Sequence, residues 1–152
     1  MAERLTIRTA LLRDAPDVAL LSGVLGYPVG DETLARRLAN LLARYEDIVL
    51  VAEVAPGHVV GWLHGAEQEL LESGRRCEIV GLVVDAAYRG QGVGRQLVAA
   101  VEEWAARRGL EQIVVRSNVI RAESHPFYER LGYVRTKTQH AYRKQLATSG
   151  AS

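Results

Sequence analysis

The stretch VVDAAYRGQGVGRQLV places three glycines at alternate positions, Gly90, Gly92 and Gly94, between an apolar segment and an amphipathic one. A glycine inside a helix costs about 1 kcal/mol relative to alanine, so several of them at a helix start require a compensating gain. The first turn of a helix has unpaired N–H groups and a partial positive charge, which suit an anion such as phosphate. Glycine leaves these groups uncovered and permits the positive φ angles that gather them into one concave site. The stretch therefore predicts a strand, an anion-binding turn and a helix in succession.

The pattern around the glycines predicts a mixed sheet. Strands are expected at residues 4–10, 47–54, 58–67, 76–84 and 110–118, with one or two closing strands within 133–146. Helices are expected from Asp14 to about Leu25, after Asp31, from Val93 to Arg108, and around Phe127 to Leu131, with Asp14 and Asp31 as N-caps. Three consecutive strands joined by short turns suggest antiparallel pairing, and the strand–helix–strand unit around the glycines suggests one parallel pair. We therefore expect an α+β fold with a mixed, mostly antiparallel central sheet and helices on both faces.

Length and composition restrict the class of protein. A chain of 152 residues suits a single domain, which we expect to span residues 1–146, with 147–152 as a frayed tail. A net charge of +1 does not indicate a nucleic-acid partner. No apolar run approaches the roughly 20 residues that a membrane span needs, and the N-terminus does not resemble a signal peptide. A single cysteine, Cys77, excludes an intrachain disulfide and fits a reducing compartment, so we expect a cytoplasmic protein.

Three classes of phosphate site compete for the glycine stretch. A nucleotide P-loop requires Lys and Ser or Thr after its last glycine, whereas Arg95 and Gln96 follow Gly94. A dinucleotide fold requires an acidic residue at the end of the next strand, which here ends in Ser117-Asn118. From glycine content alone, an ordinary glycine-rich turn with two surface arginines remains an alternative. The third class has the pattern R-x-x-G-x-G directly after a β-rich segment, as residues 89–94 follow EIVGLVVD.

This third pattern resembles the acyl-CoA signature of the GNAT superfamily of N-acetyltransferases. The stretch SNVIRAESHPFYERLGY, residues 117–133, looks like the second CoA-side motif of that superfamily, and the order of strands and helices agrees over nearly the whole chain. The resemblance implies acetyl-CoA as cosubstrate and a GNAT-like fold in which the parallel strand pair splays apart around the pantetheine arm. The cofactor-binding residues that it implies are Leu82, Val83, Val84, Arg89, Gly90, Gln91, Gly92, Val93, Gly94, Arg95, Asn118, Ser124 and Tyr128.

Within that set, the resemblance assigns different groups to different parts of the cofactor. The backbone of residues 82–84 would pair with the pantetheine arm, and the N–H groups of residues 91–95 would hold the pyrophosphate. Asn118 has a strand-end cap as its equal alternative, and Ser124 has a helix cap. Many relatives carry an asparagine seven residues before the tyrosine, where this chain has Arg121, which puts that contact in doubt.

Acetyl transfer to an amine requires an acid, a base and a donor to the thioester oxygen. By motif position the acid is Tyr128, with aromatic packing as the alternative. The oxygen donor is expected to be the N–H of Val83 or Val84, at a strand bulge that the family has there.

Glu78 is the candidate base, on the strand that leads into the glycine turn. We expect it to share a face with Val80 and Leu82, and Glu67, Glu69 or a water relay are the alternatives. His64 and His125 lack metal-ligand spacing, so we expect structural roles for both histidines and no metal site.

The acceptor is the least determined part. Acidic residues occur in the first two helices and in the hairpin HGAEQELLESG, and they weakly favour a cationic amine over the alternative of a merely solvated acidic surface. The resemblance implies an N-acetyltransferase acting on a primary amine of a small molecule or on a peptide N-terminus. The alternative is a non-catalytic acyl-CoA-binding sensor or interaction module, and a homodimer is compatible with either.

Overall fold

The computed structural model describes residues 4–24, 28–116 and 124–147. The chain forms two compact units, Met1–Arg116 and Ser117–Ser152, which are described one at a time. The elements of the first unit are β1 (Thr6–Thr9), the 3-10 turn η1 (Leu12–Asp14), α1 (Ala15–Val24), α2 (Asp31–Leu42), β2 (Asp47–Ala55), β3 (His58–Leu70), β4 (Gly74–Val84), the 3-10 turn η2 (Ala86–Tyr88), α3 (Val93–Arg107) and β5 (Ile113–Val115). None of the helices in the described ranges is long and apolar enough to cross a bilayer.

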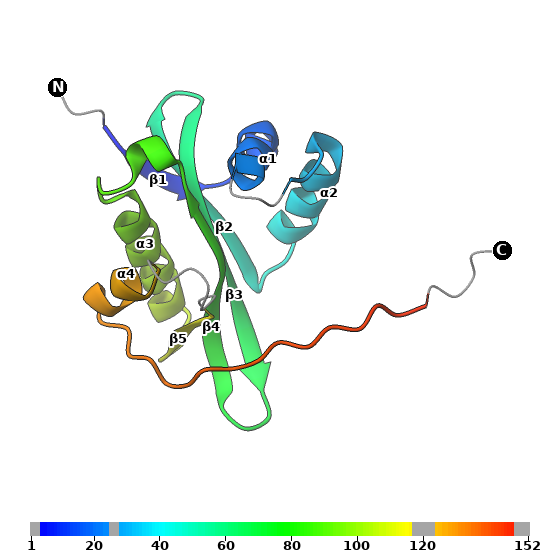
Figure 1. Cartoon of the computed structure of the whole chain (residues 1–152), viewed down its shortest axis with the longest axis vertical. Coiled ribbons are helices and arrows are strands. Elements are labelled where there is room, and N and C mark those ends of the chain that lie inside the picture. Colours follow the sequence, from blue (N-terminus) through cyan, green and yellow to red (C-terminus); the bar gives the residue numbers. More distant parts are fainter. Residues whose placement is uncertain (1–3, 25–27, 117–123, 148–152) are drawn as a thin grey trace. The chain divides into compact units, whose positions relative to one another are not determined.

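The five strands form one sheet in the order β1-β2-β3-β4-β5 (Figure 1). The first three pairings are antiparallel, and β4 pairs with β5 in parallel. The parallel pair arises because α3 carries the chain back along the sheet between these two strands. The expected mixed, mostly antiparallel sheet is thus confirmed.

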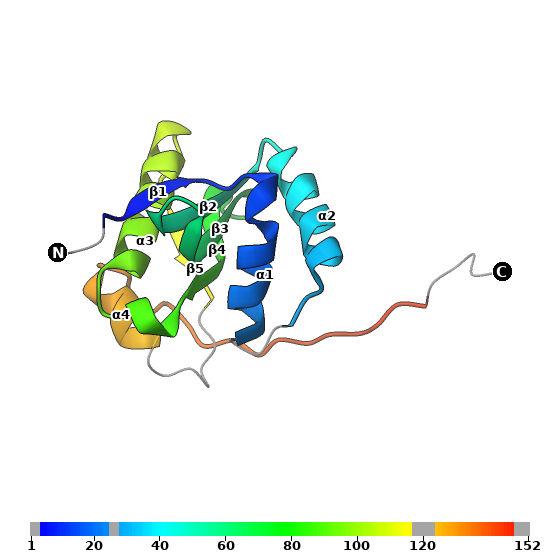
Figure 2. The ribbon, with the colours of Figure 1, turned by 90° about the horizontal axis from the view of Figure 1, so that it is seen from above.

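Helices cover both faces of this sheet, with α1 and α2 on one side and α3 on the other (Figure 2). On the α1–α2 face, Val18 and Leu38 share an apolar cluster with Val49 and Val51 of β2. On the α3 face, Val93, Leu97 and Val101 are buried, and Val101 lies so close to β3 that a Cβ at Gly65 would be 2.7 Å from the Val101 Cγ2 atom. Glycine at position 65 therefore allows α3 to pack directly on the sheet.

A bulge in β4 changes which side chains share a face. Gly65 pairs with Ile79 and His64 with Gly81, so Val80 is an extra residue on β4, and it is 50% exposed. Glu78 lies opposite Ala66 and hydrogen-bonds Gln68, which places it on the α1–α2 face together with Gly81. The expectation that Glu78 shares a face with Leu82 is wrong, because Leu82 lies opposite Leu63 beyond the bulge, which reverses the alternation between positions 78 and 82. The bulge also lies at Val80 and not at Val83 or Val84 as expected.

The two expected aspartate N-caps are also corrected. Gly30 is the N-cap of α2, and Asp31 is its first helical residue. Asp14 lies inside η1, where its carboxylate accepts the Leu11 N–H at 2.7 Å and turns toward Arg8 instead of capping α1. For this carboxylate, the ion pair with Arg8 therefore takes the place of a cap on α1.

The second unit contains α4 (Ser124–Arg130), which Gly132 ends with a φ of 92°. The expected closing strands are absent from the described residues 133–147, which form no strand or helix. Strand formation requires a partner for the backbone N–H and C=O groups, whatever the propensity of the segment. The apolar side chains there are exposed, with Val134 at 83% and Tyr142 at 93%.

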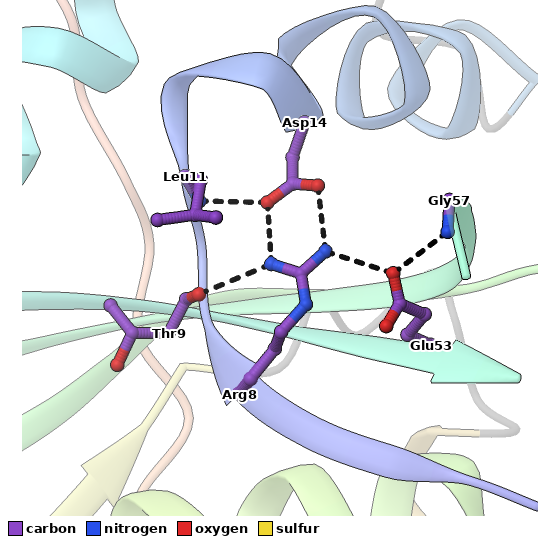
Figure 3. A network of polar contacts seen from close by, with 6 residues as sticks. All are labelled: Arg8, Thr9, Leu11, Asp14, Glu53 and Gly57. Carbon is purple, nitrogen blue, oxygen red and sulfur yellow. Dashed lines mark hydrogen bonds and ion pairs between the residues drawn. The ribbon is translucent and has the colours of Figure 1, made fainter. Parts of the chain in front are cut away.

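Arg8 connects three separate segments of the first unit (Figure 3). Its guanidinium binds both carboxylate oxygens of Asp14 at 2.8 and 2.9 Å and one oxygen of Glu53 at 3.1 Å. Glu53 also accepts the N–H of Gly57 at 3.0 Å. Burial raises the pKa of Asp14, but hydrogen bonds from Arg8 and the Leu11 N–H outweigh it, so the pKa of Asp14 lies below its ordinary value. The network ties β1 to the start of α1 and to the β2–β3 turn.

Replacement of Arg8 by Met should lower the free energy of unfolding by about 3 kcal/mol at pH 7, because it leaves the Asp14 carboxylate buried without its cation. Since the pKa of Asp14 is lowered in the folded protein, the stabilisation is present above about pH 4 and is lost as the pH falls further. Urea unfolding of the wild type and the R8M variant at pH 7 and pH 3 should therefore show a difference in unfolding free energy that is smaller at pH 3. The control is R107M, whose pair with Glu103 is exposed and should change stability by less than about 0.5 kcal/mol. Equal losses in both variants would contradict the role given to Arg8.

Candidate functional site

The glycine turn lies between the end of β4 and the first turn of α3, as the sequence predicts. Asp85 orders the beginning of this turn by accepting the Ala87 N–H at 2.9 Å. Gly90 and Gly92 adopt φ angles of 79° and 85°, which side chains disfavour. Gly92 is the N-cap of α3 and provides no side-chain cap, and the first intrahelical bond runs from the Gln96 N–H to the Gly92 carbonyl at 3.0 Å. The amides of residues 92–95 therefore precede the first intrahelical bond.

Two exposed arginines bracket this turn. The Arg95 guanidinium lies over Gly92, where a Cβ would be 3.5 Å from its Nη2 atom. A cation in the first turn opposes the helix dipole, so its presence there is favourable only beside an anion. Arg89 is exposed on the other side of the turn. Free amides, two left-handed glycines and two guanidinium groups together suit a diphosphate.

Beyond the bulge, one edge of β4 is open among the described residues. β4 pairs with β5 only from Cys77 to Ile79. At the other end of the strand, the Asp85 N–H donates to the Val60 carbonyl of β3 at 2.8 Å. Because backbone groups alternate along a strand, the backbone of Val83 then faces β3, whereas those of Leu82 and Val84 face away from it. Leu82 and Val84 are therefore the two residues whose backbone could bind an extended ligand.

Glu78 is a nearly buried carboxylate on the α1–α2 face, with 9% of the residue exposed. Its Oε1 atom accepts a hydrogen bond from Gln68 at 3.2 Å and lies 3.7 Å from an Arg116 nitrogen. A carboxylate has about four acceptor positions, so this one retains the capacity to bind a further donor. Glu78 is thus placed where a cationic group would be stabilised.

The alternative carboxylate Glu67 is engaged elsewhere. It lies opposite Cys77 and its two oxygens pair with Arg75 at 3.0 Å and Arg108 at 3.2 Å. Arg75 is the main reason that the pKa of Glu67 is lowered, and Arg108 adds to it. Arg108 is itself held between the rings of Tyr45 and Trp104. A carboxylate fixed by two guanidinium groups is a poor proton acceptor, so Glu67 is not a good base.

In the second unit, Tyr128 lies on α4 among other aromatic rings. Its ring centre is 5.0 Å from that of Phe127 and 5.8 Å from that of Tyr133. Burial raises the pKa of Tyr128 to about 12, so its hydroxyl keeps its proton at neutral pH. Asn118 lies outside the described residues, as do the side chains of Ser124 and His125.

One pair of residues was missed by the sequence reasoning. His64 Nε2 lies 2.7 Å from the Oδ1 atom of Asp47, and Asp47 Oδ2 accepts a hydrogen bond from Arg44 at 2.6 Å. His64 lies opposite Val49 and Asp47 lies opposite Ala66, so the pair is on the same face as Glu78. Only the β2–β3 register shows this proximity, because the two residues are 17 positions apart in the chain.

Comparisons with known proteins agree with this geometry. Residues 12–133 match the model of the acetyltransferase (GNAT) family. The chain is 30% identical over 148 residues to aminoglycoside N(6')-acetyltransferase type 1 of Stenotrophomonas maltophilia, covering 95% of both chains. It is 35% identical over 119 residues to glucosamine 6-phosphate N-acetyltransferase 1 of Oryza sativa subsp. japonica, covering 74% of this chain and 68% of that one. The structure of an aminoglycoside N-acetyltransferase in complex with CoA has the same fold, with a TM-score of 0.84 at 20% identity over 94% of this chain and 96% of that one.

Proposed function

The chain belongs to the acetyltransferase (GNAT) family, whose members use acetyl-CoA, and we propose that it moves the acetyl group directly to a primary amine of a small molecule or a peptide N-terminus. The observation that carries this proposal is the uncapped, glycine-lined start of α3 at the end of a strand with an open edge. The named relatives act on amines of aminoglycosides and of glucosamine 6-phosphate, which supports a small amine as acceptor.

The donor side of the site is formed by backbone groups and two cations. The amides of residues 91–95, with Arg89 and Arg95, would hold the diphosphate of acetyl-CoA, and Leu82 and Val84 would hydrogen-bond its pantetheine arm. Of the two open-edge residues, Leu82 lies farther from the glycine turn, so its N–H, and not that of Val83 or Val84, would donate to the thioester oxygen at the far end of the arm. Acetyl-CoA supplies a thioester whose carbon–sulfur bond breaks as the acceptor nitrogen bonds to the carbonyl carbon.

The acceptor side must bind an ammonium group and remove one proton from it, since an alkylammonium has a pKa near ~10. Glu78 is our first candidate for this role, because its carboxylate is nearly buried on the α1–α2 face and retains acceptor capacity. A buried negative charge attracts a cation more strongly than an exposed one. Glu78 would thus draw in the ammonium form and accept its proton directly or through water.

Tyr128 is proposed as the acid that protonates the departing thiolate. With a pKa of about 12 its donor form is always present at neutral pH. A phenol with so high a pKa donates its proton to the thiolate only if it receives a second proton from another group. The acceptor nitrogen becomes more acidic on acylation and would supply that proton. Tyr128 would thus donate one proton to the thiolate and receive one from the nitrogen.

The Tyr128→Phe variant should reduce kcat about 100-fold while the affinity for CoA stays within about twofold, since only the proton is lost. The assay is thiol release over kanamycin, glucosamine 6-phosphate, putrescine, 2-aminoethylphosphonate and an unblocked tetrapeptide. Y142F is the control, because Tyr142 is 93% exposed. Unchanged turnover in Y128F would contradict the acid assignment. Tight CoA binding without acetylation of any panel amine by the wild type would favour an acyl-CoA sensor.

The Arg95→Gln variant should weaken CoA binding about tenfold, because one charge-assisted phosphate contact is lost. Binding of pantetheine, which lacks the diphosphate, should be unaffected. Calorimetry with both ligands measures the difference. R107Q, in the last turn of the same helix, removes an equal charge far from the glycine turn and should have no effect. A similar loss of CoA affinity in R107Q would show that CoA binding depends on the net charge of the protein and not on the position of Arg95.

A further inference from the structure

The hydrogen bond between His64 and Asp47 fixes which nitrogen of the imidazole is available. Asp47 has a side chain only 7% exposed, and Arg44 donates to its second oxygen. Burial raises the pKa of Asp47, but hydrogen bonds from His64 and Arg44 outweigh it, so the pKa is lowered and the carboxylate is charged at neutral pH. A carboxylate facing Nε2 places the imidazole proton there. Nδ1 is then left with its lone pair free to accept a proton.

His64 lies at the point where the open edge of β4 begins. It pairs with Gly81, next to the bulge residue Val80. If the diphosphate lies at the start of α3, an arm that follows Val84 and then Leu82 brings its far end to Gly81. The Trp62 ring lies over Gly81, where a Cβ would be 3.0 Å from its Cη2 and Cζ3 atoms, and His64, the next residue of β3 on the same face, has a side chain that is 18% exposed and therefore reachable. The reactive end of the cosubstrate would thus arrive opposite the imidazole.

The groups around His64 divide naturally between two tasks. Asp47 from β2, with Arg44 behind it, and Glu78 from β4, with Arg116 at 3.7 Å, are charged groups on this part of the face, and Arg76 lies farther along β4, where it donates to Gln68. From α1 and α2, apolar side chains such as Val18, Leu21 and Leu38 pack in the cluster on this face. Glu78 already lies near the Arg116 guanidinium, whereas His64 has an orienting carboxylate on Nε2. An anion suits binding of the ammonium, and the imidazole suits removal of its proton.

We propose that His64 is a catalytic residue, which accepts the proton of the acceptor ammonium at Nδ1 while Asp47 orients the ring and stabilises the imidazolium. Glu78 then holds the ammonium before transfer. The proton moves from the acceptor nitrogen to Nδ1, the freed lone pair forms the bond to the carbonyl carbon as the carbon–sulfur bond breaks, and the imidazolium returns its proton to water. This inference rests on the proposed function and divides the role first given to Glu78 alone.

The test is the pH dependence of the His64→Gln variant with the panel amine that the wild type uses best. At pH 7 kcat should fall about 100-fold, with CoA affinity unchanged. The deficit should shrink as the pH approaches the pKa of the acceptor, near ~10 for an alkylamine, because the free amine then needs no base. E78Q should instead raise KM at pH 7. H140Q, which alters an exposed histidine, is the control and should match the wild type.

Two further measurements keep the test decisive if H64Q folds poorly. D47N retains the imidazole but loses its orienting carboxylate, and its kcat should fall about tenfold with the same relief at high pH. Added imidazoles should restore activity to H64A in proportion to their basicity, which a purely structural role would not produce. A deficit independent of pH, or no deficit, would overturn this inference. Absence of wild-type turnover would count against the proposed function instead.

Discussion

The extra residue Val80 in β4 determines how the two faces and the edge of the sheet are used. Before this bulge, β4 is bonded to β3 and to β5, and beyond it Leu82 and Val84 face an open edge. The bulge also moves Glu78 to the face that carries His64 and Asp47. A regular strand would have aimed the Glu78 carboxylate toward α3, into apolar packing. One inserted residue thus opens a binding edge and places a charge beside it.

A second constraint concerns the start of α3. Its N–H groups must remain without a side-chain cap, and the helix must still be held against the sheet. Gly94, inside the first turn of the helix, costs up to about 1 kcal/mol, and glycine in place of a side-chain N-cap at position 92 costs a few tenths of a kcal/mol more. Burial of Val93, Leu97 and Val101 against the sheet offsets this loss, because each large apolar side chain contributes about 1.5–3 kcal/mol. Gly61 and Gly65 let the helix approach β3 closely enough for this packing. The packed body of the helix therefore supports the weakly stabilised turn that is proposed to bind the diphosphate.

Local signals predicted most of the elements but not their mutual register. Residue spacing over a few positions was enough to predict the glycine turn, the helix α3 and the strands β2, β3 and β4. The bulge at Val80 and the Asp47–His64 pair depend on how separate strands align, and no local pattern reports that alignment. Asp14 was assigned to the wrong partner for the same reason, since Arg8 reaches it from a neighbouring strand. The segment 133–146 shows the reverse error, in which strand propensity was present without a pairing partner.

The distribution of charge over the two faces supports a cationic acceptor more strongly than the acidic composition of the hairpin does. On the α3 side, Glu67 is neutralised by Arg75 and Arg108, so it adds no net attraction. On the α1–α2 side, the Glu78 carboxylate retains acceptor positions on the face that also carries the imidazole of His64. An ammonium is attracted by the carboxylate only while it keeps its charge, so a separate proton acceptor leaves the carboxylate charged for this attraction. In the proposed division of roles, Glu78 binds the ammonium first and His64 then removes its proton.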